Sequence, residues 1–284
     1  MANALRNFLA SMIFSALASF ENWIERADTL LTDPLASWDA VLNIAMSVIR
    51  PFAILIIGIC VLIEIAMVAS KVDLLKWEHG IKLGFKMALS VALLNILPNF
   101  LRACYLQAVS WINDVAAIGG IGLGLDFLHD LETLISSVSG LGTILGLFIS
   151  TIVLVLAIQV CGVIIMAIAF GRMFEIYVYL AISPLPAAFF PLGDGSGGGF
   201  SRITMKFLRS FAAVCLQGVM MMICMRLFSI LLSDVIEEVI TANLATGGAA
   251  GVSQVMFTFL LGSIALVMSV IKSGGWAKSI LDAM

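Results

Sequence analysis

The residues most able to do chemistry in this sequence are charges placed inside long apolar runs. Glu64 and Arg226 both lie in runs long enough to cross a membrane, where a charge is costly and often functional. At about 1.5 Å of rise per residue they fall in opposite halves of the membrane, so they are not expected to pair. Lys86, one turn into the next run from the same side as Glu64, is the expected partner.

Two interpretations of these intramembrane charges follow. The simpler one is a structural ion pair between Glu64 and Lys86, together with an Arg226 side chain that extends outward to the membrane surface. The alternative gives these residues a role in a conduction or gating path.

The glycine-rich stretch GDGSGGGF has the spacing G-x-G-x-x-G at Gly193, Gly195 and Gly198. That spacing binds phosphate when it follows a strand, and neither a strand pattern nor a Gly-Lys-Ser/Thr motif is present here. A flexible loop is therefore expected. His79 and His129 are single loop histidines, and the cysteines lie singly in apolar runs, so neither a metal site nor a disulfide is expected.

No nucleophile, base and orienting group can be assembled from these residues, and the sequence therefore predicts a non-enzymatic protein without a cofactor. Composition identifies the broader class. Of the 284 residues, 62% are hydrophobic and 12% are charged, which excludes an ordinary soluble domain. The apolar runs predict an all-α, polytopic membrane protein.

Five apolar runs are expected to span the membrane, because each is close to the required length of about 20 residues. A sixth candidate, residues 174–192, contains Pro184, Pro186 and Pro191 and leads into the glycine-rich stretch. The five expected spans are residues 48–69, 83–102, 143–170, 208–232 and 254–271.

The distribution of Lys and Arg decides whether residues 174–192 cross, because cytoplasmic loops are enriched in both. With five spans and the N-terminus outside, the outer side holds only Arg6, Arg26, Arg50 and Arg102. The inner side then holds Lys71, Lys76, Lys82, Lys86, Arg172, Arg202, Lys206, Arg209, Lys272 and Lys278. A sixth span would move Arg202, Lys206 and Arg209 outside and would lose this separation.

We therefore predict five transmembrane helices, with the N-terminus outside, the C-terminus cytoplasmic and residues 174–192 as a re-entrant or interfacial hairpin. Backbone groups freed by Pro184 and Pro186 must be satisfied by neighbouring protein or by water in a cavity. This requirement favours a position at a pore or a subunit interface.

We expect residues 1–45 to form an interfacial N-terminal region on the outer side of the membrane, and residues 46–284 to form the helical membrane domain. Apolar residues recur every three or four positions from Leu5 to Ile24, which predicts an amphipathic helix lying on the membrane surface. A cleaved signal peptide ending at Ala18 is the alternative, and the uninterrupted periodicity favours the helix. The outer loop, residues 103–140, should hold an apolar first half, a glycine break and a short helix.

The third span carries small residues at positions that would allow helices to pack closely. Gly142, Gly146 and Ser150 form one such face, and Gly162 begins another. These faces predict helix association, either within the chain or between copies.

The block from Gly171 to Gly218 resembles the TrbL family, the polytopic inner-membrane subunit of type IV secretion systems, in the short form found in Gram-positive conjugative elements. The pattern is an Arg with a nearby Glu, a proline-containing apolar core, a glycine break and a basic residue before the next span. The resemblance is firmest over 165–220. By this resemblance, the residues at the positions of the family pattern are candidates for a conduit or gating role. They are Arg172, Glu175, Pro184, Pro186, Gly197, Gly198, Gly199 and Arg202.

The resemblance implies a non-enzymatic platform or conduit subunit in a bacterial cytoplasmic membrane, which helps pass single-stranded DNA or protein out of the cell. It implies membrane lipid and other secretion subunits as partners: a membrane ATPase, a coupling ATPase and small bitopic subunits. A homo-oligomeric ring, with a pentamer as the working hypothesis, fits the small-residue faces. Longer relatives carry a large hydrophilic C-terminal domain; no such domain is expected in this chain, and the functions of that domain are therefore not expected from it.

Two other classes of membrane protein are alternatives to this one. A small-molecule or ion transporter or channel would place its binding site at the broken segment 180–199. No internal repeat is present and few polar residues lie in the spans, which argues against it. A small pore-forming protein is the third class, and five spans with a structured loop argue against that as well.

Overall fold

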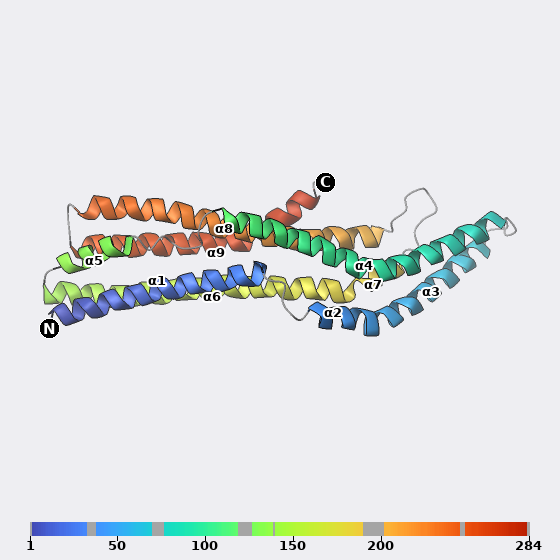
Figure 1. Ribbon diagram of the computed structural model, residues 1–284, viewed down its shortest axis with the longest axis horizontal. Coiled ribbons are helices and arrows are strands. Elements are labelled where there is room, and N and C mark those ends of the chain that lie inside the picture. The colour runs from blue at the N-terminus through green and yellow to red at the C-terminus, as the bar shows by residue number, and fades with distance from the viewer. Residues whose placement is uncertain are drawn as a thin grey trace. The chain divides into compact units, whose positions relative to one another are not determined.

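The computed structural model of the chain describes residues 2–32, 38–69, 77–118, 127–138, 140–189, 202–244 and 248–282. Within these ranges the chain forms helices and no strand, which confirms the predicted all-α class (Figure 1). The helices are α1 (Ala2–Thr32), α2 (Trp38–Ile44), η1 (Ala45–Ile49), α3 (Arg50–Ala69), α4 (Trp77–Ala117), α5 (Phe127–Ser137), α6 (Leu141–Ile182), α7 (Pro184–Ala188), α8 (Arg202–Leu244) and α9 (Ala249–Asp282).

Five helical stretches in the described residues are long and apolar enough to cross a membrane, which confirms the number predicted. The third stretch has a mean hydropathy of 2.9 and joins the expected span 143–170 to most of the segment 174–192. The stretches are Trp38–Ala66, Leu83–Ala117, Gly142–Ala188, Ile203–Asn243 and Ala249–Leu281.

Helix α6 continues without a break from Leu141 to Ile182, so no additional spanning helix begins between residues 171 and 182. Gly171 is tolerated within it, and the helix is interrupted at Ser183, next to the first proline, although the Ser183 backbone keeps right-handed helical dihedrals (φ −52°, ψ −30°). Residues 190–192 and the glycines Gly193 to Gly199 lie outside the described residues. The re-entrant path of 174–192 therefore stays a prediction.

The expected outer loop begins later than predicted, because α4 continues through Pro98 to Ala117. Residues 103–117 are thus helical. The short helix expected in the second half of the loop is present as α5, with Leu131, Leu134 and Ile135 buried. The expected glycine break at 119–124 lies outside the described residues.

The first spanning stretch contains one widened helical turn, the π-helix η1. It ends at Ile49, two residues before Pro51, which has no N–H to donate to the Ser47 carbonyl and whose ring crowds that carbonyl. The N–H of Arg50 instead bonds to the carbonyl of Ala45, five residues back. The proline thus accounts for the local change of helix type.

The chain divides into two compact units, each built from segments far apart in sequence. The boundaries fall within α4, α6 and α8 and near the end of α9, so these helices contribute to both. Unit 1 comprises Met1–Asp33, Trp111–Gly171 and Gly218–Trp276, and unit 2 comprises Pro34–Ser110, Arg172–Gln217 and Ala277–Met284.

In unit 1 the core is built around the apolar stripe of α1. Phe20 packs edge-on against Phe228 of α8 and Phe259 of α9, and α1 lies beside α6 (Figure 1). The amphipathic helix expected from the sequence is present, and its stripe contacts protein. The buried stripe consists of Leu9, Ile13, Leu17, Phe20, Ile24 and Leu31.

Gly162 allows α1 to approach α6 closely. A Cβ atom at this position would lie 2.8 Å from Cδ1 of Trp23 and 3.2 Å from Cδ2 of Phe20. A Cβ at Gly142 or Gly146 would meet nothing within 4 Å. One of the two small-residue faces predicted on α6 is therefore used within the chain.

In unit 2 the short helix α7 packs against α3 and α4. Its alanines Ala187 and Ala188 are buried in one apolar cluster with Ala53 and Ile57 of α3 and Leu94 of α4. A second cluster surrounds Trp38, whose ring stacks on Tyr105 with 5.1 Å between centroids and 10° between planes.

Candidate functional site

The proline break between α6 and α7 is the first part of the candidate site, and its backbone is satisfied locally. Pro184 has no N–H, so it cannot donate to the carbonyl of Leu180 as a helical residue would. Ser183 takes over this role, since its Oγ donates to the Leu180 oxygen at 2.7 Å and its N–H donates at 3.2 Å. The α6 helix therefore ends with that carbonyl fully bonded.

Two hydroxyl groups from neighbouring helices bond to the carbonyls of α7. Ser90 of α4 donates to the carbonyl of Ala187, and Thr204 of α8 donates to that of Pro186, each at 2.8 Å. Both hydroxyl side chains are fully buried. These two carbonyls lie in the last turn of α7; the carbonyls that the prolines deprive of a helical donor are those of Leu180 and Ile182, of which Leu180 is bonded by Ser183.

The sequence did not predict Ser90 and Thr204 as site residues. Each is a small hydroxyl residue in an otherwise apolar helix, a common arrangement because such groups usually bond to their own helix. Only the position of α7 shows that these two bond elsewhere. The proximity of Thr204 to the basic residues that begin α8 was the available signal.

Arg172 and Glu175, three residues apart, form an ion pair on one face of α6, with 2.6 Å between Nη1 and Oε2. The pair is only partly exposed. It belongs to the same unit as the proline break and lies about two turns before Ser183. The Arg and nearby Glu of the family pattern are thus direct partners.

Glu64 of α3 and Lys86 of α4 form the ion pair predicted between them, which also contains a hydrogen bond from Lys86 Nζ to Glu64 Oε1. Both side chains are mostly shielded within unit 2. The sequence could predict this pair because both residues lie about one turn from the inner ends of their predicted spans, and therefore at similar depths in the membrane.

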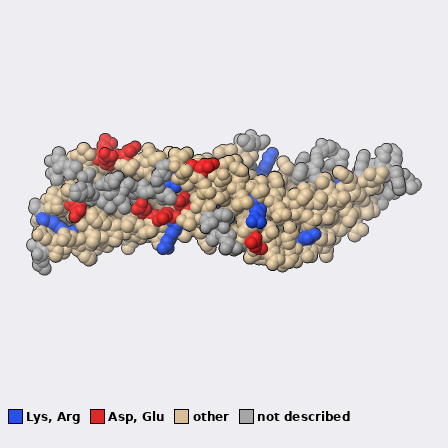
Figure 2. Space-filling view, in the orientation of Figure 1, with Lys and Arg blue, Asp and Glu red and all other residues tan. Residues whose placement is uncertain are grey.

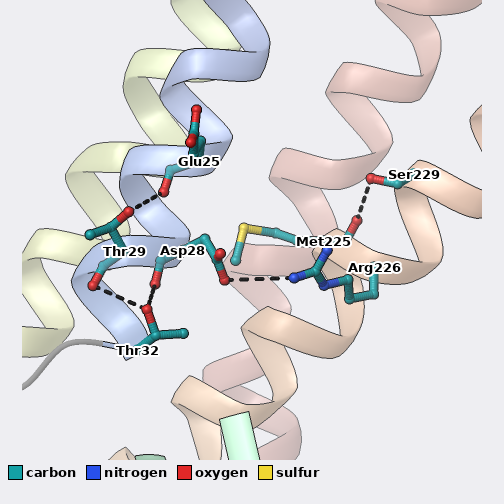
Figure 3. Close-up of polar contacts among 7 residues, drawn as sticks. All are labelled: Glu25, Asp28, Thr29, Thr32, Met225, Arg226 and Ser229. Atoms are coloured by element: carbon teal, nitrogen blue, oxygen red, sulfur yellow. Dashed lines mark hydrogen bonds and ion pairs between the residues drawn. The ribbon is translucent and has the colours of Figure 1, made fainter. Parts of the chain in front are cut away.

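The expectation that Arg226 extends outward is wrong. Its residue is only 6% exposed, and its Nη2 atom lies 4.0 Å from Oδ1 of Asp28 on α1 (Figure 3). The guanidinium turns inward because the buried carboxylate lies within unit 1. The sequence did not reveal this partner, since Asp28 is remote in the chain and outside the predicted spans.

The Asp28–Arg226 separation exceeds a hydrogen-bond distance, and Asp28 Oδ1 accepts no hydrogen bond. A cavity of about 10 Å³ adjoins both side chains and is also lined by Met222, Met225 and Ser229. Figure 3 shows the two charged groups pointing toward each other from α1 and α8. The cavity has room for about one water molecule, which could bridge them.

Burial raises the pKa of the Asp28 carboxyl above its ordinary value, an effect that the positive charge of Arg226 partly offsets. The neighbouring carboxylate of Glu25 adds a smaller increase. Burial therefore makes the charged form of Asp28 costly, and Arg226 is the group that compensates for it.

The structure brings together only part of the predicted set. Arg172, Glu175, Pro184 and Pro186 lie in one unit, with Glu64 and Lys86, whereas Arg226 lies in the other. Arg202 begins α8, and its side chain lies outside the described residues, as do Gly197 to Gly199.

Acidic side chains gather over the end of α8 (Figure 2). Asp234, Glu237 and Glu238 line a shallow, open hollow on this surface. Among the described residues, no group of three or more His, Cys, Asp or Glu has a metal-binding arrangement. The hollow is therefore a solvated acidic face of unit 1.

The family comparison bears on the same elements. The TrbL/VirB6 plasmid conjugal transfer-like family matches residues 34–184, more than half of the chain. The chain belongs to the TrbL/VirB6 family. No curated protein and no solved structure matches it.

The TrbL/VirB6 match covers the two ion pairs of unit 2 and ends at the first proline of the break. Arg172, Glu175 and Pro184 lie within it, whereas Pro186 and Arg202 lie beyond its end. The segment of firmest resemblance, 165–220, thus extends past the matched region. The chain is a multi-pass membrane protein of a conjugal-transfer family.

Proposed function

We propose that this chain is a non-enzymatic platform or conduit subunit of a conjugative type IV secretion machine in a bacterial cytoplasmic membrane. In this role it helps single-stranded DNA or protein cross that membrane. The observation that carries the proposal is the family match over residues 34–184. Its partners would be the membrane ATPase, the coupling ATPase, the small bitopic subunits and further copies of itself in a ring.

The buried proline break supports a structural role for the segment 174–189. The carbonyls of Leu180, Pro186 and Ala187 already accept hydrogen bonds from hydroxyl groups. A transporter that bound an ion at this break would need such carbonyls to face its substrate. Their engagement within the protein favours a fixed joint over a transport site.

Deletion of the gene from its conjugative element tests the proposal. Transfer of the element should be abolished while growth of the host is unchanged, and expression of the intact chain in trans should restore transfer. Normal transfer without the gene, or a defect confined to uptake of one solute, would contradict the proposal. The second result would favour the transporter.

A further inference from the structure

The Asp28–Arg226 pair is enclosed by apolar side chains. The two residues are 8% and 6% exposed, and Ile24, Met222 and Met225 line the space beside them. Buried charges are costly unless they are paired and hydrogen-bonded. Arg226 Nη2 and Asp28 Oδ1 are 4.0 Å apart, which is too far for a hydrogen bond. The direct contact therefore compensates only part of the cost of burial.

Asp28 is also unfavourably placed on the helix that carries it. It lies one turn before the end of α1 at Thr32, where the helix dipole is negative and opposes a carboxylate. The last turn of α1 contains no basic residue, and Glu25, three residues earlier, carries the same charge as Asp28. Compensation for the Asp28 charge must therefore come from outside α1.

Three polar groups line the cavity between α1 and α8: the Asp28 carboxylate, the Arg226 guanidinium and the Ser229 hydroxyl (Figure 3). Asp28 Oδ1 accepts no hydrogen bond. Ser229 Oγ donates to the carbonyl of Met225 at 3.3 Å, and its lone pairs can still accept. The cavity thus offers two acceptors and the N–H groups of one guanidinium.

The size and the charges of this cavity select its ligand. Its volume of about 10 Å³ is close to that of a single water molecule. The positive charge of Arg226 would repel a cation, and the negative charge of Asp28 would repel an anion. A water molecule accepts a hydrogen bond from Arg226 and donates to both Asp28 and Ser229, and about three such bonds are typical of buried water.

We propose that one ordered water molecule binds in this cavity and joins Asp28 of α1 to Arg226 and Ser229 of α8. The ion pair between the two helices is then completed through water, which costs little compared with a direct bond. This proposal goes beyond the proposed function, because it concerns how α1 is held on α8 and not what crosses the membrane. It is tested on the purified chain, so it can fail separately from the role in transfer.

Radiolytic oxidation of the full chain in detergent solution tests the proposal. A millisecond X-ray pulse splits water into hydroxyl radicals, and a bound water molecule oxidises the side chains that touch it. Met222 and Met225 line the cavity and are 1% and 3% exposed, so radicals from bulk solvent do not reach them. Methionine sulfur is readily oxidised to the sulfoxide, which mass spectrometry locates in the sequence.

Met221 and Met256 are the controls within the same chain. They are 0% and 1% exposed in the same core and do not line the cavity. Met222 and Met225 should oxidise several-fold faster than these two. Equally slow oxidation of all four methionines would overturn the proposal. This comparison needs no substitution, so it decides the matter even where a variant does not fold.

Ser229→Val should remove the rapid oxidation of Met222 and Met225, because the branched side chain fills the cavity and lacks the hydroxyl acceptor. Ser263→Val is the matched control. Ser263 is also buried in unit 1 and bonds four residues back, to the carbonyl of Phe259, without lining the cavity. Oxidation should persist in that variant. Rapid oxidation that also persists in a folded Ser229→Val chain would overturn the proposal.

Discussion

At the residue scale, hydroxyl groups decide whether a proline break can be buried. The carbonyls at the end of α6 and in α7 would be unmet acceptors in an apolar setting, and the hydroxyl groups of Ser183, Ser90 and Thr204 each donate one hydrogen bond to them. A buried acceptor without a donor is costly. The break is therefore a packed joint that depends on a few specific side chains.

Replacing Thr204 with Val should destabilise the protein, because the shape is kept and the donor to the Pro186 carbonyl is lost. The expected loss is about 1–3 kcal/mol of unfolding free energy. It is measured as a lower Tm in detergent solution. Thr241→Val is the matched control, since the Thr241 hydroxyl is exposed and bonds within α8 to the carbonyl of Glu237. Equal Tm changes in both variants would contradict this account.

The buried carboxyl of Asp28 should make stability depend on pH in a definite direction. Its pKa in the folded protein is raised above the ordinary value of 3.8, so the folded state binds more protons than the unfolded chain just above that pH. The contribution of Asp28 to stability is present below pH 3.8 and is lost as pH rises through the raised pKa.

Asp28→Asn isolates this contribution, since Asn does not titrate. The Tm of the native chain minus that of the variant should fall as pH rises from about 4 to 7. Loss of the charge that pairs with Arg226 also shifts the Tm of the variant, but this shift does not vary with pH and so leaves the pH dependence of the Tm difference unchanged. A difference in Tm that grows with pH would show that the pKa of Asp28 is lowered instead.

At the element scale, a helix surface is defined by what neighbouring helices do with it. The two small-residue faces of α6 look alike in the sequence, yet only the one at Gly162 receives α1. Gln159, one turn away on the same helix, accepts a hydrogen bond from Ser19 and donates one to the carbonyl of Ala16. Close approach and polar bonding thus act together to dock α1 on α6.

Gly162→Ala should weaken this docking, because the added Cβ would overlap Trp23 at 2.8 Å. The expected loss is about 1–3 kcal/mol, read as a lower Tm and faster proteolysis of α1. Gly146→Ala is the control in the same helix, since nothing lies within 4 Å of its Cβ. Its stability should be unchanged or raised by up to about 1 kcal/mol through helix propensity. Similar losses in both variants would refute the docking role of Gly162.

Sequence patterns predicted some of these elements and not others, for physical reasons. The lengths of the apolar runs predicted the five spans. The Glu64–Lys86 pair could be predicted because both residues lie at a similar depth below the same membrane surface. Amphipathic periodicity predicted the buried stripe of α1, but periodicity gives no information on whether that stripe meets lipid or protein. The Asp28–Arg226 pair and the caps from Ser90 and Thr204 depend on tertiary packing, which local patterns do not contain.

At the scale of the whole molecule, five spans have a consequence for the termini. An odd number of crossings places the two ends on opposite sides of the membrane, and the Lys and Arg distribution predicts that the C-terminus is cytoplasmic. The TrbL/VirB6 match concerns the family and does not determine this orientation.

Reporter fusions should reveal that orientation. A fluorescent protein fused after Met284 should be bright, whereas an export-dependent phosphatase at the same position should be inactive, because the C-terminus stays in the cytoplasm. The same phosphatase joined to the N-terminus through an export-competent linker should be active. An active phosphatase at both ends would require an even number of crossings.

The bonds of α7 also constrain the order of biogenesis. Ser90 is synthesised before α7, but Thr204 follows it in the chain, so the Pro186 carbonyl cannot acquire its donor until the start of α8 has left the ribosome. A chain inserted only as far as α7 would hold that acceptor unmet. Membrane insertion of this protein therefore completes α6 and α7 together with α8, as one late step of translation.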